Sequence, residues 1–333
     1  YDIFKRLFRW YMLAGGLLFV LIIVQIFKSY NKRLNLCIKI LVGIVLGLFI
    51  LHTGGLITRW YLSGHAPWSD AYESMIYVAW ATMLFGLLLA NNKDKKKSKV
   101  KDSDSKIVSK LIPFYGIFHN KSSDITLAAA AFVTSMILMI AHWNWMDPAI
   151  ANLEPVLQGY WLMIHVSVIV GSYGPFTLAM ILGIVVLILM IFTNKENKAK
   201  MDVNIKELTI INEMALTVGL VMLTIGNFLG GMCANASWGR YWGWDPKETW
   251  ALISIMIYAF VIHMRLVPGL RGRWLYNLMS VLAYGSILMT YFGVNFYLSG
   301  LHSYASGDQI LSFQFISITL DMIALLGCVY YSK

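Results

Sequence analysis

The chain has 333 residues, of which 58% are hydrophobic and 13% charged, and its mean hydropathy is +0.64. Soluble domains carry about 45–50% apolar and about 25% charged residues, so this composition excludes a disordered, collagen-like or ordinary soluble protein. The apolar residues stand in long blocks, many of about 18 residues, the length that crosses the hydrocarbon core of a bilayer. The sequence therefore predicts an all-α, polytopic transmembrane helical bundle in a lipid bilayer.

The apolar blocks predict about nine spans, within a range of eight to ten. They are expected at 10–27, 36–58, 72–90, 124–142, 160–192, 209–230, 249–266, 275–297 and 309–331. Residues 1–50 are expected to form a junction with the first span or spans, and residues 51–333 the main transmembrane domain.

The positive charges orient these spans. Most of the 27 Lys and Arg residues lie in the loops of one side, with the largest group at 91–123, and the positive-inside rule makes that side cytoplasmic. The net charge of +10 thus reports topology, and we exclude a nucleic-acid partner. The N-terminus then lies outside, which an upstream part before Tyr1 would explain. The three cysteines stand far apart and indicate neither a disulfide framework nor a zinc site.

The external loop at 230–250, between the sixth and seventh spans, is rich in tryptophan. Its four tryptophans are Trp238, Trp242, Trp244 and Trp250. An aromatic belt at the level of the lipid headgroups is the ordinary explanation, but glycines between the rings also let a flat partner approach the backbone. We expect a shelf for a large planar ligand, with Arg240 near its anionic groups. Trp238 and Trp242 would share a face if this segment is helical.

The end of this loop carries a helix start signal. Asp245 followed by Pro246 is typical of a helix N-cap with proline in the first turn, and Glu248 would complete a capping box. For Asp245 this structural role has at least as much weight as direct contact with a ligand.

Three histidines are candidate metal ligands. His165 near the external start of the fifth span and His302 in the last external loop both reach the side of the tryptophan-rich loop. Neutral imidazole is a common axial ligand of haem iron, so the two could hold an iron porphyrin from opposite faces. His263 lies ~20 Å along the seventh span from Trp250, toward the cytoplasmic leaflet. An ionisable group inside a span is a functional hypothesis, and snorkelling beside Arg265 is the alternative.

One arginine and four further histidines complete the candidate residues. Arg59, one of few external cations, opens an aromatic loop that ends at Ser74, and we expect it to reach the propionates of a haem or a partner protein. Structural roles are favoured for the other four histidines: His52, His65, His119 and His142.

These residues resemble a known family. The segment WGRYWGWDPKETW is similar to the WWD signature of haem-handling membrane proteins, and RWYLSGHAPWSDAYES with the histidines at 165, 263 and 302 resembles the CcsA family of system II cytochrome c biogenesis. The resemblance implies haem b as the cofactor, His165 and His302 as its external axial ligands, and His263 as a ligand for haem on its way across the membrane. Trp238, Trp242, Trp244, Asp245 and Trp250 then belong to the loop that presents haem.

The resemblance also implies an activity. Family members transport haem and attach it to apocytochrome c by thioether bonds at a CxxCH motif, as holocytochrome c synthases acting with a CcsB part that is separate or fused upstream. The expected location is the bacterial inner membrane with a periplasmic site, or alternatively a thylakoid membrane. A WWD-type exporter that delivers haem to a chaperone without attachment is the nearest alternative. A solute transporter and a membrane cytochrome b are less favoured, because we find no internal repeat and the histidine pair is expected at the outer surface.

Overall fold

The structure is a computed structural model that describes residues 3–27, 32–90, 121–142, 147–150 and 160–298. Within these residues the secondary structure is helical, with no strand. The α-helices are α1 (Phe4–Phe27), α2 (Lys32–Ser63), α3 (Ala71–Ala90), α5 (Lys121–Ile140), α6 (Tyr160–Ile191), α7 (Lys198–Trp238), α8 (Pro246–His263), α9 (Arg273–Leu288) and α10 (Val294–Tyr297).

The predicted fold class is confirmed. Among the described residues, seven helices are long and apolar enough to cross a membrane, and Asp124–Ile140 is a shorter apolar helix. Together they cover eight of the nine predicted spans, and the ninth, 309–331, lies outside the described residues. The protein is therefore a multi-pass membrane protein.

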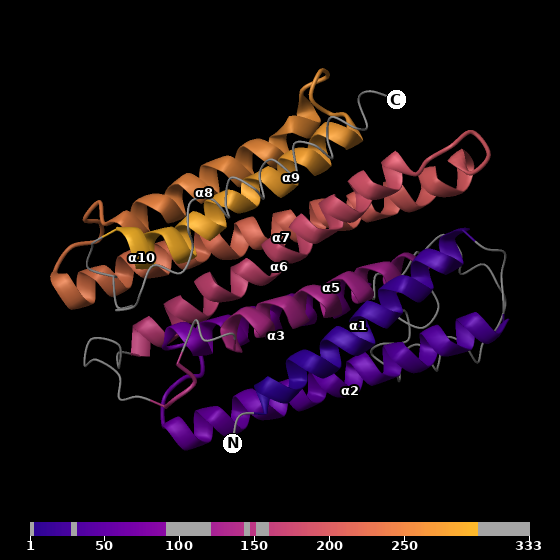
Figure 1. Ribbon diagram of the computed structural model, residues 1–333. Helices are drawn as coiled ribbons and strands as arrows, with labels where there is room; N and C mark the ends of the chain where they lie inside the picture. The colour runs from indigo at the N-terminus through magenta and orange to yellow at the C-terminus, as the bar shows by residue number, and fades with distance from the viewer. Residues whose placement is uncertain (1–2, 28–31, 91–120, 143–146, 151–159, 299–333) are drawn as a thin grey trace, which may run out of the picture.

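The helices pack in successive pairs, from α1 and α2 through α3 and α5 to α6 and α7, and finally α8 and α9 (Figure 1). Their axes run in the same general direction, so the bundle has two ends. We call one the tryptophan end, where α2, α5 and α7 finish and α3, α6 and α8 begin. The other is the opposite end, where the α6–α7 hairpin turns (Figure 1).

Small residues bring the central helices together. An added Cβ at Gly174 of α6 would lie 2.7 Å from the carbonyl carbon of Ala81 in α3. Without a hydrophobic driving force between helices in lipid, close backbone approach of this kind supplies much of the packing attraction. A buried polar group adds to it, since the Asn212 side-chain amide in α7 donates to Asn277 Oδ1 (2.9 Å) and Ser280 Oγ (3.0 Å) of α9.

Helix α7 is longer than the span predicted from the sequence. The span predicted at 209–230 is a helix of 41 residues that continues at both ends into more polar sequence. It stops at Trp238 because Gly239 adopts the left-handed conformation (φ 71°) that ends helices, and residues 239–244 are not helical. The condition under which Trp238 and Trp242 would share a helical face is therefore not met.

Candidate functional site

The tryptophan-rich loop is fixed to the helix that follows it. The Asp245 carboxylate accepts a hydrogen bond from the Lys247 N–H (3.2 Å), and Glu248 Oε2 accepts from the N–H groups of Asp245 (3.3 Å) and Gly243 (2.8 Å). The predicted capping box at the start of α8 is thus confirmed. Contact between Asp245 and a ligand stays a prediction.

The loop places one tryptophan outward on a strained backbone. Trp244 is 72% exposed and has a φ of 57°, a backbone conformation that residues other than glycine rarely adopt. Its ring meets Trp242 edge to face, with ring centroids 5.8 Å apart. Trp238 and Trp250 are half-buried, and Arg240 is exposed. Strain of this kind persists where the surroundings enforce it, often at binding sites.

His165 is half-buried near the start of α6, and its ring is held by the neighbouring helix. Its Nδ1 lies 2.9 Å from the carbonyl oxygen of Gly226 in α7. A carbonyl oxygen only accepts, so Nδ1 carries a proton, and in the neutral imidazole the lone pair is on Nε2. A backbone carbonyl on one ring nitrogen is the usual arrangement that fixes a histidine for ligation through the other nitrogen.

The tryptophan-rich loop and His165 approach neighbouring residues of α7. An added Cβ at Gly231 would lie 3.1 Å from the carbonyl oxygen of Tyr241 in the loop, and one at the preceding residue, Gly230, would meet the His165 ring. The loop and His165, far apart in the sequence, are thus both positioned by one turn of α7.

Of the other two candidate histidines, the structure describes only His263, which lies away from this site. His263 is the exposed last residue of α8, at the opposite end of the bundle, and its Nδ1 lies 2.7 Å from the Ala259 carbonyl oxygen. His302 lies outside the described residues. The last described helix before it in the chain is α10, and Lys247 at the start of α8 donates a hydrogen bond to Asn295 Oδ1 in that helix (3.0 Å).

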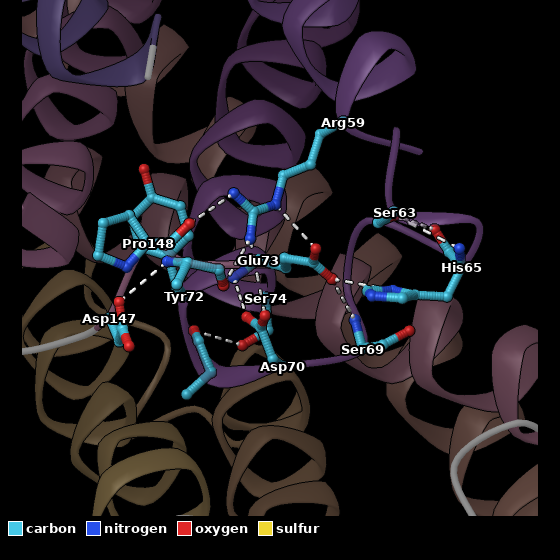
Figure 2. A network of polar contacts seen from close by, with 12 residues as sticks. Arg59, Ser63, His65, Ser69, Asp70, Tyr72, Glu73, Ser74, Asp147 and Pro148 are labelled. Atoms are coloured by element: carbon cyan, nitrogen blue, oxygen red, sulfur yellow. Dashed lines mark hydrogen bonds and ion pairs between the residues drawn. The ribbon is translucent and has the colours of Figure 1, made fainter. Parts of the chain in front are cut away.

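Arg59 is engaged by the protein itself (Figure 2). Its Nε donates to Glu73 Oε1 (2.8 Å), and its Nη1 and Nη2 donate to the carbonyl oxygens of Pro148 (3.0 Å) and Ala149 (3.4 Å). Asp70 lies 3.8 Å from the same guanidinium. These contacts give Arg59 the role of a cross-link between α2, α3 and the segment after α5, and its contact with haem propionates stays a prediction.

Comparisons with known proteins identify the family. Residues 68–302 match the family described as cytochrome C assembly protein. The chain belongs to this family. It is 43% identical to Protein NrfI of Wolinella succinogenes over 93% of this chain and 31% of that protein. It is 31% identical to the cytochrome c biogenesis protein CcsA of Prochlorococcus marinus subsp. pastoris (84% of this chain, 87% of the relative) and 30% identical to CcsA of Lobularia maritima (79% and 85%).

The family membership confirms the resemblance found in the sequence. The protein is a CcsA-type cytochrome c biogenesis protein with a role in cytochrome c maturation. It spans about a third of the length of NrfI and most of the length of the CcsA relatives. The domain boundary expected at residue 50 stays a prediction.

One central residue of this CcsA-type protein was missed from its sequence. Glu73 is fully buried and binds three groups: Arg59, the Ser69 N–H (3.2 Å) and the His65 ring at 3.5 Å. The signal was available, because Asp70 caps α3 by accepting from the Glu73 N–H (2.6 Å) and the two residues have the spacing of a capping box.

Asp70 should make the stability of the protein depend on pH. Burial, together with repulsion from Glu73, raises the pKa of Asp70 to about 6. The folded protein therefore holds a proton that the unfolded chain releases near pH 4, and its free energy of unfolding falls as the pH rises from about 4 to about 6. The shift corresponds to at most about 3 kcal/mol. Solvent screening reduces this, since 28% of the side chain is exposed.

The variant Asp70→Asn tests this dependence, because asparagine keeps the cap acceptor and does not ionise. Thermal unfolding in detergent is measured from pH 4 to pH 7. The stability of the variant relative to the wild type should increase as the pH rises. Parallel profiles for the two proteins would show that Asp70 titrates normally.

Proposed function

We propose that the protein carries haem b to the tryptophan end and holds it there for covalent attachment to apocytochrome c. The observation that carries this proposal is the position of the His165 ring, which bonds to the Gly226 carbonyl through Nδ1 and packs on Gly230, next to the residue of α7 that the tryptophan-rich loop approaches. Neutral imidazole is a common axial ligand of haem iron, and the aromatic rings offer a surface for the porphyrin face.

The proposed ligand set is His165 on one face of the haem and His302 on the other. Trp244 and Trp242 would contact the ring, and the exposed Arg240 would reach the propionates. His263, at the opposite end of α8, would receive haem there with the help of the CcsB part. The proposed location is the bacterial inner membrane with the tryptophan end in the periplasm.

The attachment reaction needs little acid–base catalysis from this protein. Each cysteine thiol of the CxxCH motif adds across a vinyl group of haem, so that sulfur bonds to one carbon and the thiol hydrogen goes to the other. No group leaves and no oxidant is consumed. The contribution of the protein is to fix the haem so that each vinyl group meets one thiol, and such positioning alone supplies much of a barrier.

The first test is the absorption spectrum of the detergent-purified protein, produced together with its CcsB part and a haem supply. The wild type should show low-spin haem before and after dithionite. His165→Ala and His302→Ala should each lose that signal or convert it to a high-spin one, while the control His119→Ala, in the Lys-rich segment 91–123, should not. A wild-type spectrum in His165→Ala, or loss confined to His263→Ala, would refute the external site.

The second test separates attachment from delivery. A reporter cytochrome with a CxxCH motif is produced with the protein, and covalent haem is stained after denaturing electrophoresis. Haem should remain on this reporter and be absent from one with SxxSH. A protein that binds haem at His165 but yields no covalent product would favour the WWD-type exporter.

A further inference from the structure

Helices α6 and α7 run antiparallel in a register set by glycines. Three glycines of α7 each meet a side chain of α6: Gly219 with Phe176, Gly226 with Ile169 and Gly230 with His165. The steps of seven and four residues along α7 match the same steps backwards along α6. His165 is therefore the last of three side chains that fit into the glycine-lined face of α7.

Gly230 leaves the space that the imidazole occupies. A Cβ added at this position would lie 2.6 Å from His165 Cε1 and 3.2 Å from both ring nitrogens. A real Cβ does not approach a ring carbon so closely, so the ring would have to move away from α7. Even alanine at position 230 is incompatible with the observed place of the ring.

The hydrogen bond to Gly226 depends on this close approach. Gly226 and Gly230 are one turn apart, so the same stretch of α7 backbone supports the ring and supplies the acceptor for Nδ1. A ring displaced by a Cβ would lengthen the 2.9 Å contact and lose the bond that fixes its tautomer.

The far side of α6 is held as well. Trp68 Nε1 donates to the carbonyl oxygen of Met163 (3.1 Å), and Tyr77 Oη donates to that of Ser167 (3.3 Å). These two carbonyls flank His165 in the sequence and face α3 and the loop before it. A shift of α6 away from α7 would compress these two contacts, so α6 has little room to yield on that side.

We infer that Gly230 and the Gly226 carbonyl together position the His165 imidazole as a haem ligand, with Gly230 the residue that determines where Nε2 lies. The inference rests on the proposed function and deepens it. Gly230 is a positioning residue, since it acts through His165.

The test compares two glycine-to-alanine changes in the same helix. Gly230→Ala should displace His165, whereas Gly219→Ala forces a Cβ to 2.8 Å from the Phe176 ring and strains the same helix pair away from His165. Each protein is purified with its CcsB part, and the spin state of its haem and its thermal unfolding are measured. Gly230→Ala should lower haem affinity at least tenfold and give high-spin haem, and added imidazole should restore the low-spin spectrum.

Gly219→Ala should keep the wild-type spectrum even if it unfolds at a lower temperature. The inference is overturned if Gly230→Ala keeps the wild-type haem spectrum, or if Gly219→Ala changes it equally. Should Gly230→Ala fail to accumulate, Trp68→Phe, which removes one support of α6, must shift the spin state in the same direction or the inference fails. A wild type that binds no haem, or a His165→Ala that binds it normally, would instead refute the proposed function.

Discussion

Replacing Glu73 by glutamine should lower the free energy of unfolding by about 3 kcal/mol or more, because it leaves the Arg59 charge without its buried partner. Glu73 is fully buried, and its carboxylate binds Arg59 Nε at 2.8 Å and the Ser69 N–H at 3.2 Å. Glutamine has nearly the same shape, so the loss reports charge and hydrogen bonding with little change in packing. Thermal unfolding of the purified protein in detergent measures it.

The matched control is Glu213→Gln. Glu213 forms an ion pair of almost the same length with Arg265 (2.9 Å), but 38% of its side chain is exposed. Solvent-exposed pairs contribute roughly 0–1 kcal/mol, so this variant should unfold nearly like the wild type. Equal effects of the two substitutions would show that burial of Glu73 does not strengthen its pair.

The Glu73 network also supports the proposed haem site. Arg59 holds the backbone at Pro148 and Ala149, and Glu73 holds Ser69, the neighbour of Trp68. Trp68 in turn donates to Met163, two residues before His165. A buried ion pair at the tryptophan end is thus connected through hydrogen bonds to the helix that carries the candidate ligand.

Hydropathy predicted the membrane helices well but misjudged their ends. The span expected at 160–192 is α6 (Tyr160–Ile191), since its ends coincide with a change in polarity. The span expected at 209–230 is α7 (Lys198–Trp238), which is longer by a polar stretch at each end. Hydropathy reports where a chain can meet lipid, and a helix can continue beyond the membrane for as long as its backbone hydrogen bonds are made.

The two helix starts with the spacing of a capping box show how local and long-range information differ. Asp245 and Glu248 were predicted from their spacing and from Pro246, and the structure has them as expected. Asp70 and Glu73 have the same spacing, yet the importance of Glu73 comes from Arg59, fourteen residues earlier in another helix. A local pattern predicts where a helix starts. It does not predict which charged side chain will neutralise a carboxylate buried at that start.

The surroundings of His165 were beyond prediction for a similar reason. The sequence suggested a ligand histidine near an external helix end; His165 lies near the start of α6, and its role as a ligand and its side of the membrane stay predictions. Its contacts with Gly226 and Gly230 depend on the register between α6 and α7, which a single sequence does not reveal. The glycines of α7 were visible as residues but gave no sign of the side chains they would meet.

Trp244→Gly should weaken haem binding by the loop without lowering the stability of the protein. Trp244 has a φ of 57°, which costs a residue with a side chain about 1–2 kcal/mol and costs glycine almost nothing. The ring is 72% exposed, so its removal sacrifices little packing within the protein. The variant should therefore be as stable as the wild type or more stable by about 1 kcal/mol in thermal unfolding.

The same variant should bind haem at the tryptophan end at least tenfold more weakly. A tryptophan covered by a planar ligand buries about 150–250 Å² at about 25 cal/mol per Å², so losing even a third of that contact removes about 1.4 kcal/mol, or one power of ten. Haem titration followed by absorption measures the affinity. Trp244→Phe keeps an aromatic ring and should retain most of the affinity, and Tyr61→Ala removes a still more exposed aromatic side chain near the end of α2 and should have no effect. If Trp244→Gly binds haem like the wild type, the exposed ring serves the membrane interface and the proposed shelf lies elsewhere on the loop.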